Sequence, residues 1–170
     1  MRLKKASVLL SILLIIICVA LLWFLILKQD EISLETINEN ITVENIKLGM
    51  SEQDVIALWG EGIRHEGFGG FQRDYKNKGI LIGFSGDRDN DLYGRVSSLQ
   101  ISNSKYSIFS IKVGEDRESS IASLVTEGFK SNKEHLDLYE NGEYCIQLDG
   151  VKVETITIWF ADKELKDRIY

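Results

Sequence analysis

The sequence predicts an α+β fold, in which an N-terminal transmembrane helix precedes two repeated helix-plus-three-strand units that form an antiparallel sheet with the helices on one face. Three observations predict this fold. Residues 6–27 are apolar and uncharged. The stretch 46–64, IKLGMSEQDVIALWGEGIR, recurs at 111–130 as IKVGEDRESSIASLVTEGFK. After each copy, apolar and polar residues alternate, as expected for strands with one buried face.

The segment 6–27, ASVLLSILLIIICVALLWFLIL, contains no charge and no proline. At about 1.5 Å rise per residue, a helix of this length spans roughly 33 Å, enough for the ~30 Å hydrocarbon core of a bilayer. Arg2, Lys4 and Lys5 precede it, so the positive-inside rule places residues 1–5 in the cytoplasm and the rest outside the cell membrane. A cleaved signal peptide is the alternative, but its apolar core is typically only about 7–15 residues long.

Charge and cysteine content narrow the possible partners. All 26 acidic residues lie at position 30 or later, so the part beyond the membrane segment is strongly acidic. This charge argues against nucleic acid and against anionic lipid head groups as partners. Cys18 and Cys145 cannot form a disulfide if Cys18 lies in the bilayer. The domain must then rely on a hydrophobic core, which a chain of about 125 residues can build.

Residues 28–44 are polar with spaced apolar side chains and are expected to form a partly helical tether. Repeat unit 1 is expected to cover residues 45–103. Its helix begins with Ser51 three residues before Asp54, which resembles a capping box with aspartate in place of glutamate. Residues 65–70, HEGFGG, predict a flexible loop after the helix. Strands are then expected at 71–76, 80–84 and 95–102.

Repeat unit 2, with a charged C-terminal tail, is expected to cover residues 104–170. Gly114 follows Gly49 by 65 residues, whereas Ile121 follows Val55 by 66 residues. This difference predicts one added residue in the turn that leads into the second helix. Two such units, each marginal alone, can share one continuous sheet.

A short pattern in unit 1 carries a family resemblance, namely Ile46, Gly49, Met50, Ser51, Val55, Leu58 and Gly60. A helix with this opening, followed by three antiparallel strands, resembles the SmpA/OmlA-like small-lipoprotein superfamily of outer-membrane assembly. The tandem arrangement resembles the β-lactamase-inhibitor-protein-like architecture. The chain departs from the first family in having Glu61-Gly62 where a proline usually follows the helix. The resemblance implies a non-enzymatic binding scaffold.

One acidic stretch has partial metal-loop spacing. Asp87, Asp89 and Asp91 recur like positions 1, 3 and 5 of a calcium loop. Leu92 stands where that loop needs glycine, and Ser98 stands where it needs glutamate. A solvated hairpin tip is therefore the preferred interpretation, with calcium as the alternative.

No catalytic constellation is evident, so we expect the protein not to be an enzyme and to need no metal or cofactor. His65 and His135 are expected in loops of different units, and neither has the spacing of a zinc site. The stretch 83–87, GFSGD, lacks the last glycine of a G-x-S-x-G nucleophile elbow and ends a strand instead of entering a helix.

The sheet face opposite the helices is the candidate binding site. If the apolar positions of the strands face the core, alternation places a small, polar set with one large aromatic on the other face. The binding candidates in this set are Trp159, Thr157, Thr155, Gln100, Gln147 and Leu81. Trp159 is the expected anchor, because tryptophan is enriched at binding hot spots. A merely solvated face is the alternative interpretation.

The sequence therefore predicts a membrane-anchored, extracytoplasmic, non-catalytic module that binds a protein or peptide of the cell envelope. The first alternative is an accessory subunit of a membrane complex that acts through residues 6–27. The second is an envelope hydrolase, which needs a deep pocket with converging polar groups.

Overall fold

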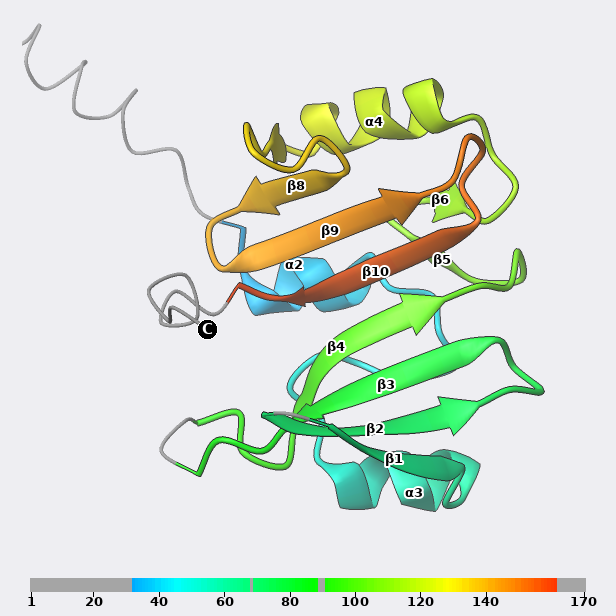
Figure 1. Cartoon of the computed structure of the whole chain (residues 1–170), viewed down its shortest axis with the longest axis vertical. Helices are drawn as coiled ribbons and strands as arrows, with labels where there is room; N and C mark the ends of the chain where they lie inside the picture. The colour runs from blue at the N-terminus through cyan, green and yellow to red at the C-terminus, as the bar shows by residue number, and fades with distance from the viewer. Residues whose placement is uncertain (1–31, 68, 89–90, 162–170) are drawn as a thin grey trace, which may run out of the picture. The chain divides into compact units, whose positions relative to one another are not determined.

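The computed structural model describes residues 32–161 except residues 68, 89 and 90 (Figure 1). The strands in this part are β1 (Ile63–Gly67), β2 (Gly70–Tyr75), β3 (Ile80–Ser85), β4 (Val96–Ile101), β5 (Ser107–Ile108), β6 (Ile111–Lys112), β7 (Lys130–Ser131), β8 (Leu138–Asn141), β9 (Tyr144–Asp149) and β10 (Thr155–Phe160). Eight of them form an antiparallel sheet in the order β1-β2-β3-β4-β10-β9-β8-β7, and β5 pairs with β6. The helices are α2 (Leu34–Glu39), α3 (Glu52–Trp59) and α4 (Arg117–Thr126).

The predicted fold of three strands per unit is wrong. Each half of the chain contributes four strands to the eight-stranded sheet, because β1 and β7 are added at its two edges. β1 falls where the sequence predicted a helix end and a loop. All five of its residues are exposed, so it carries no apolar alternation that would reveal it as a strand. β7 has only two residues, both exposed.

The predicted transmembrane helix at residues 6–27 lies outside the described residues. Across residues 32–161, apart from the three omitted positions, no helix combines the length and the apolar character needed to cross a membrane.

Residues 32–44, assigned from the sequence to a tether, belong to the folded domain. The Ser33 side chain caps α2 by accepting a hydrogen bond from the Thr36 amide, and Ile37 is completely buried. Asn38 fixes the helix to the following segment. Its side chain accepts from the Leu48 amide at 2.8 Å and donates to the Leu48 carbonyl at 3.1 Å.

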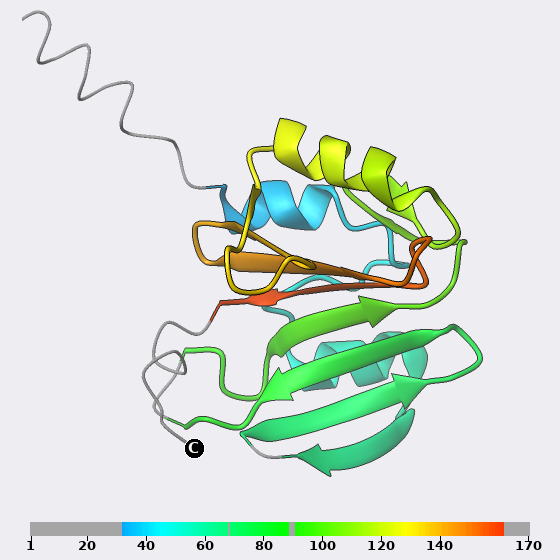
Figure 2. The same cartoon turned by 45° about the horizontal axis from the view of Figure 1, so that its top comes forward.

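The hydrophobic core lies between the sheet and the helices (Figure 2). It is built from alternate strand residues, of which Ile82, Leu99, Ile101, Ile146, Leu148, Ile156 and Ile158 are completely buried. Ile37 of α2, Val55 of α3 and Leu124 of α4 belong to the same cluster. The three helices therefore cover one face of the sheet, and no described helix covers the other.

Equivalent contacts relate the two halves by an approximate two-fold axis. At the centre of the sheet, β4 pairs with β10, which begins 59 residues later in the chain. Leu99 pairs with Ile158 while Ile101 pairs with Ile156, so the two strands exchange equivalent partners. Gln100 pairs with Thr157, and the axis passes through this pair.

The two longer helices begin at equivalent positions in the two halves, which corrects the predicted place of the added residue. Ser51 and Asp116 are the N-caps of α3 and α4, and each stands two residues after its glycine, Gly49 or Gly114. The extra residue is therefore not in the turn before the helix, as the sequence suggested. It lies between the N-cap and the glycine that follows the helix, because Gly128 follows Gly62 by 66 residues and both glycines have positive φ.

Candidate functional site

The open sheet face brings most of the predicted binding residues into one row. Leu81, Gln100, Thr157 and Gln147 are successive cross-strand partners on β3, β4, β10 and β9. Directly opposite side chains in antiparallel strands lie about 4.5–5.5 Å apart at Cβ, so these four residues form a continuous line. All four are half-buried. The row is centred on the Gln100–Thr157 pair, where the two halves of the domain meet.

Trp159 lies in the neighbouring row, among small residues. Its cross-strand partners are Ser98 and Cys145, and Gly83 lies beyond Ser98. None of these three neighbours has a side chain approaching the size of an indole ring. Trp159 is half-buried, so part of its ring is available for contact. A large aromatic that stands above smaller neighbours has the form of an interface anchor.

Asp149, which is not among the predicted binding residues, orders the polar end of this face. Its carboxylate accepts a hydrogen bond of 2.7 Å from the Gln147 side chain and one of 2.6 Å from the Thr155 hydroxyl. Gln147 and Thr155 are thus held in fixed positions by one shared acceptor. The signal for Asp149 was its place between two candidate residues at the Asp149-Gly150 turn. Polar groups held in this way lose less side-chain entropy when they bind.

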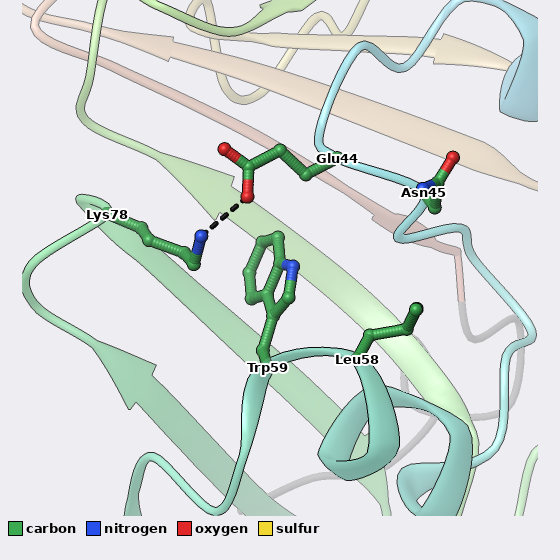
Figure 3. Close-up of a pocket in the computed structure, with 5 residues that line it drawn as sticks. All are labelled: Glu44, Asn45, Leu58, Trp59 and Lys78. Atoms are coloured by element: carbon green, nitrogen blue, oxygen red, sulfur yellow. Dashed lines mark hydrogen bonds and ion pairs between the residues drawn. The ribbon is translucent and has the colours of Figure 1, made fainter.

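A concavity lies in the first half of the domain, at Glu44, Asn45, Leu58, Trp59 and Lys78 (Figure 3). Its volume is about 390 Å³, and it is shallow and open to solvent. The Lys78 ammonium lies 2.5 Å from the Glu44 carboxylate and 4.7 Å from the centroid of the Trp59 ring. The lining therefore combines an indole, an aliphatic side chain and an ion pair.

Glu44 is the centre of a compact charge cluster. Its carboxylate accepts hydrogen bonds from Lys105 and Lys78 at 2.5 Å each and from the Tyr106 hydroxyl at 2.8 Å. These bonds, that from Lys105 above all, lower the pKa of the Glu44 carboxyl to about 2. Glu44 therefore stays ionised at neutral pH. Since three donors already engage it, the carboxylate is a structural anchor and not an available base.

In the second half of the domain, the position equivalent to Glu44 is occupied by Phe109. Glu44 and Asn45 have left-handed backbone angles, φ 35° and 68°, and so do Phe109 and Ser110, at φ 51° and 64°, 65 residues later. Phe109 is buried, and its ring packs edge-on against Phe129 with centroids 5.2 Å apart. The same turn thus serves core packing in one half and a charge cluster in the other. The mismatch between Glu44 and Phe109 was the sequence signal for this pocket.

The remaining candidates are not assembled into a site by the described residues. Asp89 lies outside them, Asp91 is exposed, and Asp87 is half-buried with its backbone amide donating to the Ser85 hydroxyl at 3.3 Å. Among the residues that the structure describes, no three or more His, Cys, Asp or Glu side chains gather as metal ligands would. His65 lies on β1 and not in a loop, with Nε2 3.9 Å from an Asp74 carboxylate oxygen.

Comparison with known proteins gives a fold likeness. No protein-family model and no curated protein matches the chain. The structure is similar to the crystal structure of an extracellular protein containing a SCP domain from Bacillus anthracis str. Ames, with a TM-score of 0.51 and 13% identity. The match covers 72% of this chain and 47% of the other, so the chain spans about half the length of that protein. At this identity the likeness concerns the fold alone.

Proposed function

We propose that this chain is a non-catalytic module that binds a protein partner through its open sheet face, outside the cytoplasm. The observation that carries the proposal is the arrangement of Trp159 and the Gln100–Thr157 row on the face that no described helix covers. The partner is an envelope protein or an exposed peptide segment of one. The acidic domain is not suited to nucleic acid.

The chemistry of the face favours a protein over a small molecule. Small-molecule sites are usually concave and enclose most of their ligand. This face is instead a pleated surface with one large aromatic, a polar row and the Gln147–Asp149–Thr155 network. Protein interfaces are commonly built in this way, with a central aromatic anchor surrounded by hydrogen-bonding groups.

The proposed location rests on the N-terminal sequence. Residues 6–27 are uncharged and long enough to cross a bilayer, and the basic residues Arg2, Lys4 and Lys5 come first. This pattern supports attachment to the cell membrane with the domain outside. The protein of similar fold is itself described as extracellular, which agrees with this location.

Site-specific photo-crosslinking in intact cells tests the proposal. A photoreactive amino acid replaces Thr157 in the full-length chain, and the matched control replaces Glu118, an exposed residue of α4 on the helix side. We expect a crosslinked product of defined mass from position 157, at least tenfold more abundant than from position 118. Trp159→Ala should reduce that product at least tenfold without unfolding the domain.

Equal yields from positions 157 and 118, or a yield that Trp159→Ala does not change, would contradict the proposal. One of these outcomes would support the accessory-subunit alternative. If the product persists in the Trp159→Ala chain but disappears when residues 6–27 are exchanged for an unrelated membrane segment, the chain acts as an accessory subunit through that segment.

A further inference from the structure

β1 is the edge of the sheet best suited to pair with another strand. It lies at one end of the eight-stranded sheet and, among the described elements, pairs with β2 alone. Its five residues are all exposed, and its register against β2 runs through all five pairs without a bulge. The other edge strand, β7, has only two residues. A regular exposed edge offers its outer backbone donors and acceptors to a further strand.

The sequence of β1, Ile63–Gly67, is self-complementary about its middle residue. If two copies of β1 pair antiparallel with His65 opposite His65, Arg64 of each copy lies opposite Glu66 of the other. Opposite side chains then approach to about 5 Å at Cβ, where unlike charges stabilise a strand pair and like charges destabilise it.

This register pairs unlike charges, whereas its nearest neighbours pair like charges. Shifting the pairing by two residues, which keeps each side chain on its own face of the sheet, places either two Arg64 or two Glu66 side chains opposite each other. Charges on an edge strand commonly prevent pairing. Here their order favours one partner, a second copy of the same strand.

We propose that two copies of this chain associate through β1, with His65 at the two-fold axis. The two eight-stranded sheets then continue into one another, with the helices of both copies on the same side. The interface is the same patch on both copies, as closed two-fold symmetry requires. It uses the edge of the sheet and leaves the open face of both domains accessible.

Contacts within one chain hold the Arg64 guanidinium in a fixed position at the proposed interface. Its guanidinium lies 3.6 Å from the centroid of the Phe71 ring, and Nη1 contacts a Glu52 carboxylate oxygen at 3.0 Å. Nε contacts Glu66 of the same chain at 2.6 Å, yet the Glu66 side chain remains 73% exposed. A second carboxylate therefore meets an ordered guanidinium, which reduces the entropy lost on pairing.

Mixing two charge variants of the full-length chain in detergent tests the proposal. Arg64→Glu has a carboxylate at both positions, and Glu66→Arg has a guanidinium at both. Each alone places like charges across the axis, so we expect its dimer to dissociate at least tenfold more readily than the wild type. Mixed in equal amounts, they should form a heterodimer of nearly wild-type affinity, measured by energy transfer between differently labelled chains.

A cysteine pair tests the register in a Cys18→Ser, Cys145→Ala background. In either type of antiparallel pair the two residues at position 65 have Cα atoms about 4.5 or 5.5 Å apart, within the range of about 4.4–6.8 Å for disulfides. His65→Cys should therefore form a disulfide dimer under mild oxidation. The matched control is Ile63→Cys, on the same strand and face and 48% exposed. Its two copies lie about 13 Å apart in this register and should not react.

Three results would overturn the proposal. The first is a wild-type chain that remains monomeric by sedimentation at every concentration tested. The second is a mixture of charge variants that associates no better than either variant alone, which would assign Arg64 and Glu66 to contacts within one chain. The third is crosslinking of Ile63→Cys as efficient as that of His65→Cys, which would indicate random collision. Circular dichroism of each variant shows whether it is folded.

Discussion

Adjacent residues of β10 should respond to truncation in opposite ways. Ile158 is completely buried in the core, whereas Trp159 points to the open face and is half-buried. Ile158→Ala removes three buried carbons, worth about 0.8 kcal/mol each in transfer free energy, and leaves a cavity that adds to the cost. We therefore expect a loss of about 3–4 kcal/mol in the free energy of unfolding, or roughly 10 °C in Tm.

Trp159→Ala should lower the free energy of unfolding by no more than about 1–2 kcal/mol, because part of the ring is already solvated and the residue is outside the core. Thermal unfolding followed by circular dichroism measures both variants in the same detergent. Partner crosslinking should show the reverse order, with a large effect of Trp159→Ala. If Trp159→Ala destabilises the domain as much as Ile158→Ala, Trp159 is a core residue and not the anchor of a binding face.

Three further predictions concern the fold and its charges. The pKa of Glu44 is about 2 when folded and about 4.5 when unfolded, so its stabilising contribution is complete above pH 4.5 and is lost as the pH falls toward 2. Glu44→Gln should flatten the dependence of Tm on pH over this range, and an unchanged profile would remove Glu44 as the cause. Gly150 and Gly114 both have φ 95°, but a Cβ on Gly150 would lie 2.4 Å from a backbone oxygen while one on Gly114 meets nothing within 4 Å. Gly150→Ala should therefore lower Tm clearly more than Gly114→Ala, which costs only the strain of about 1–2 kcal/mol, and equal shifts would contradict this. Arg73, 4% exposed, donates two hydrogen bonds to Glu52, so Arg73→Met should cost about 2–3 kcal/mol in chemical denaturation; a neutral effect would show that the pair is dispensable.

Alternation and capping were readable from the sequence. The apolar positions of β3 and β4 that were assigned to the core, such as Ile82 and Leu99, are buried. Ser51 caps α3 as predicted, accepting a hydrogen bond from the Asp54 amide at 3.2 Å. Both features depend on local patterns, period-two burial and side-chain-to-backbone bonding, which a sequence displays directly.

The features of the fold that the sequence did not predict depend on contacts between distant parts of the chain. β1 is a strand because it pairs with the edge of β2, although none of the residues of β1 is buried. Residues 32–44 look polar, yet Ile37, Ile41 and Val43 are buried because the core extends over them. In both places tertiary pairing outweighs the local pattern.

The sequence predicted which residues share the candidate face, but not how they are arranged on it. Period-two alternation identified the members of the set, including Leu81, Gln100 and Thr157. Their alignment in one row depends on the pairing of β4 with β10, which joins distant parts of the chain. The Asp149 network and the Glu44 pocket also depend on contacts between strands and loops, so single positions in the sequence did not reveal them.

Obstructing the centre of the open face tests the proposed function most directly. Gln100→Arg places a long cation beside Thr157, and Glu118→Arg is the matched control on α4. Neither side chain belongs to the hydrophobic core, so Tm should move by no more than about 2 °C. We expect partner crosslinking from position 157 to fall at least tenfold in Gln100→Arg and to be unaffected by Glu118→Arg. Undiminished crosslinking in a folded Gln100→Arg chain would contradict the proposed function.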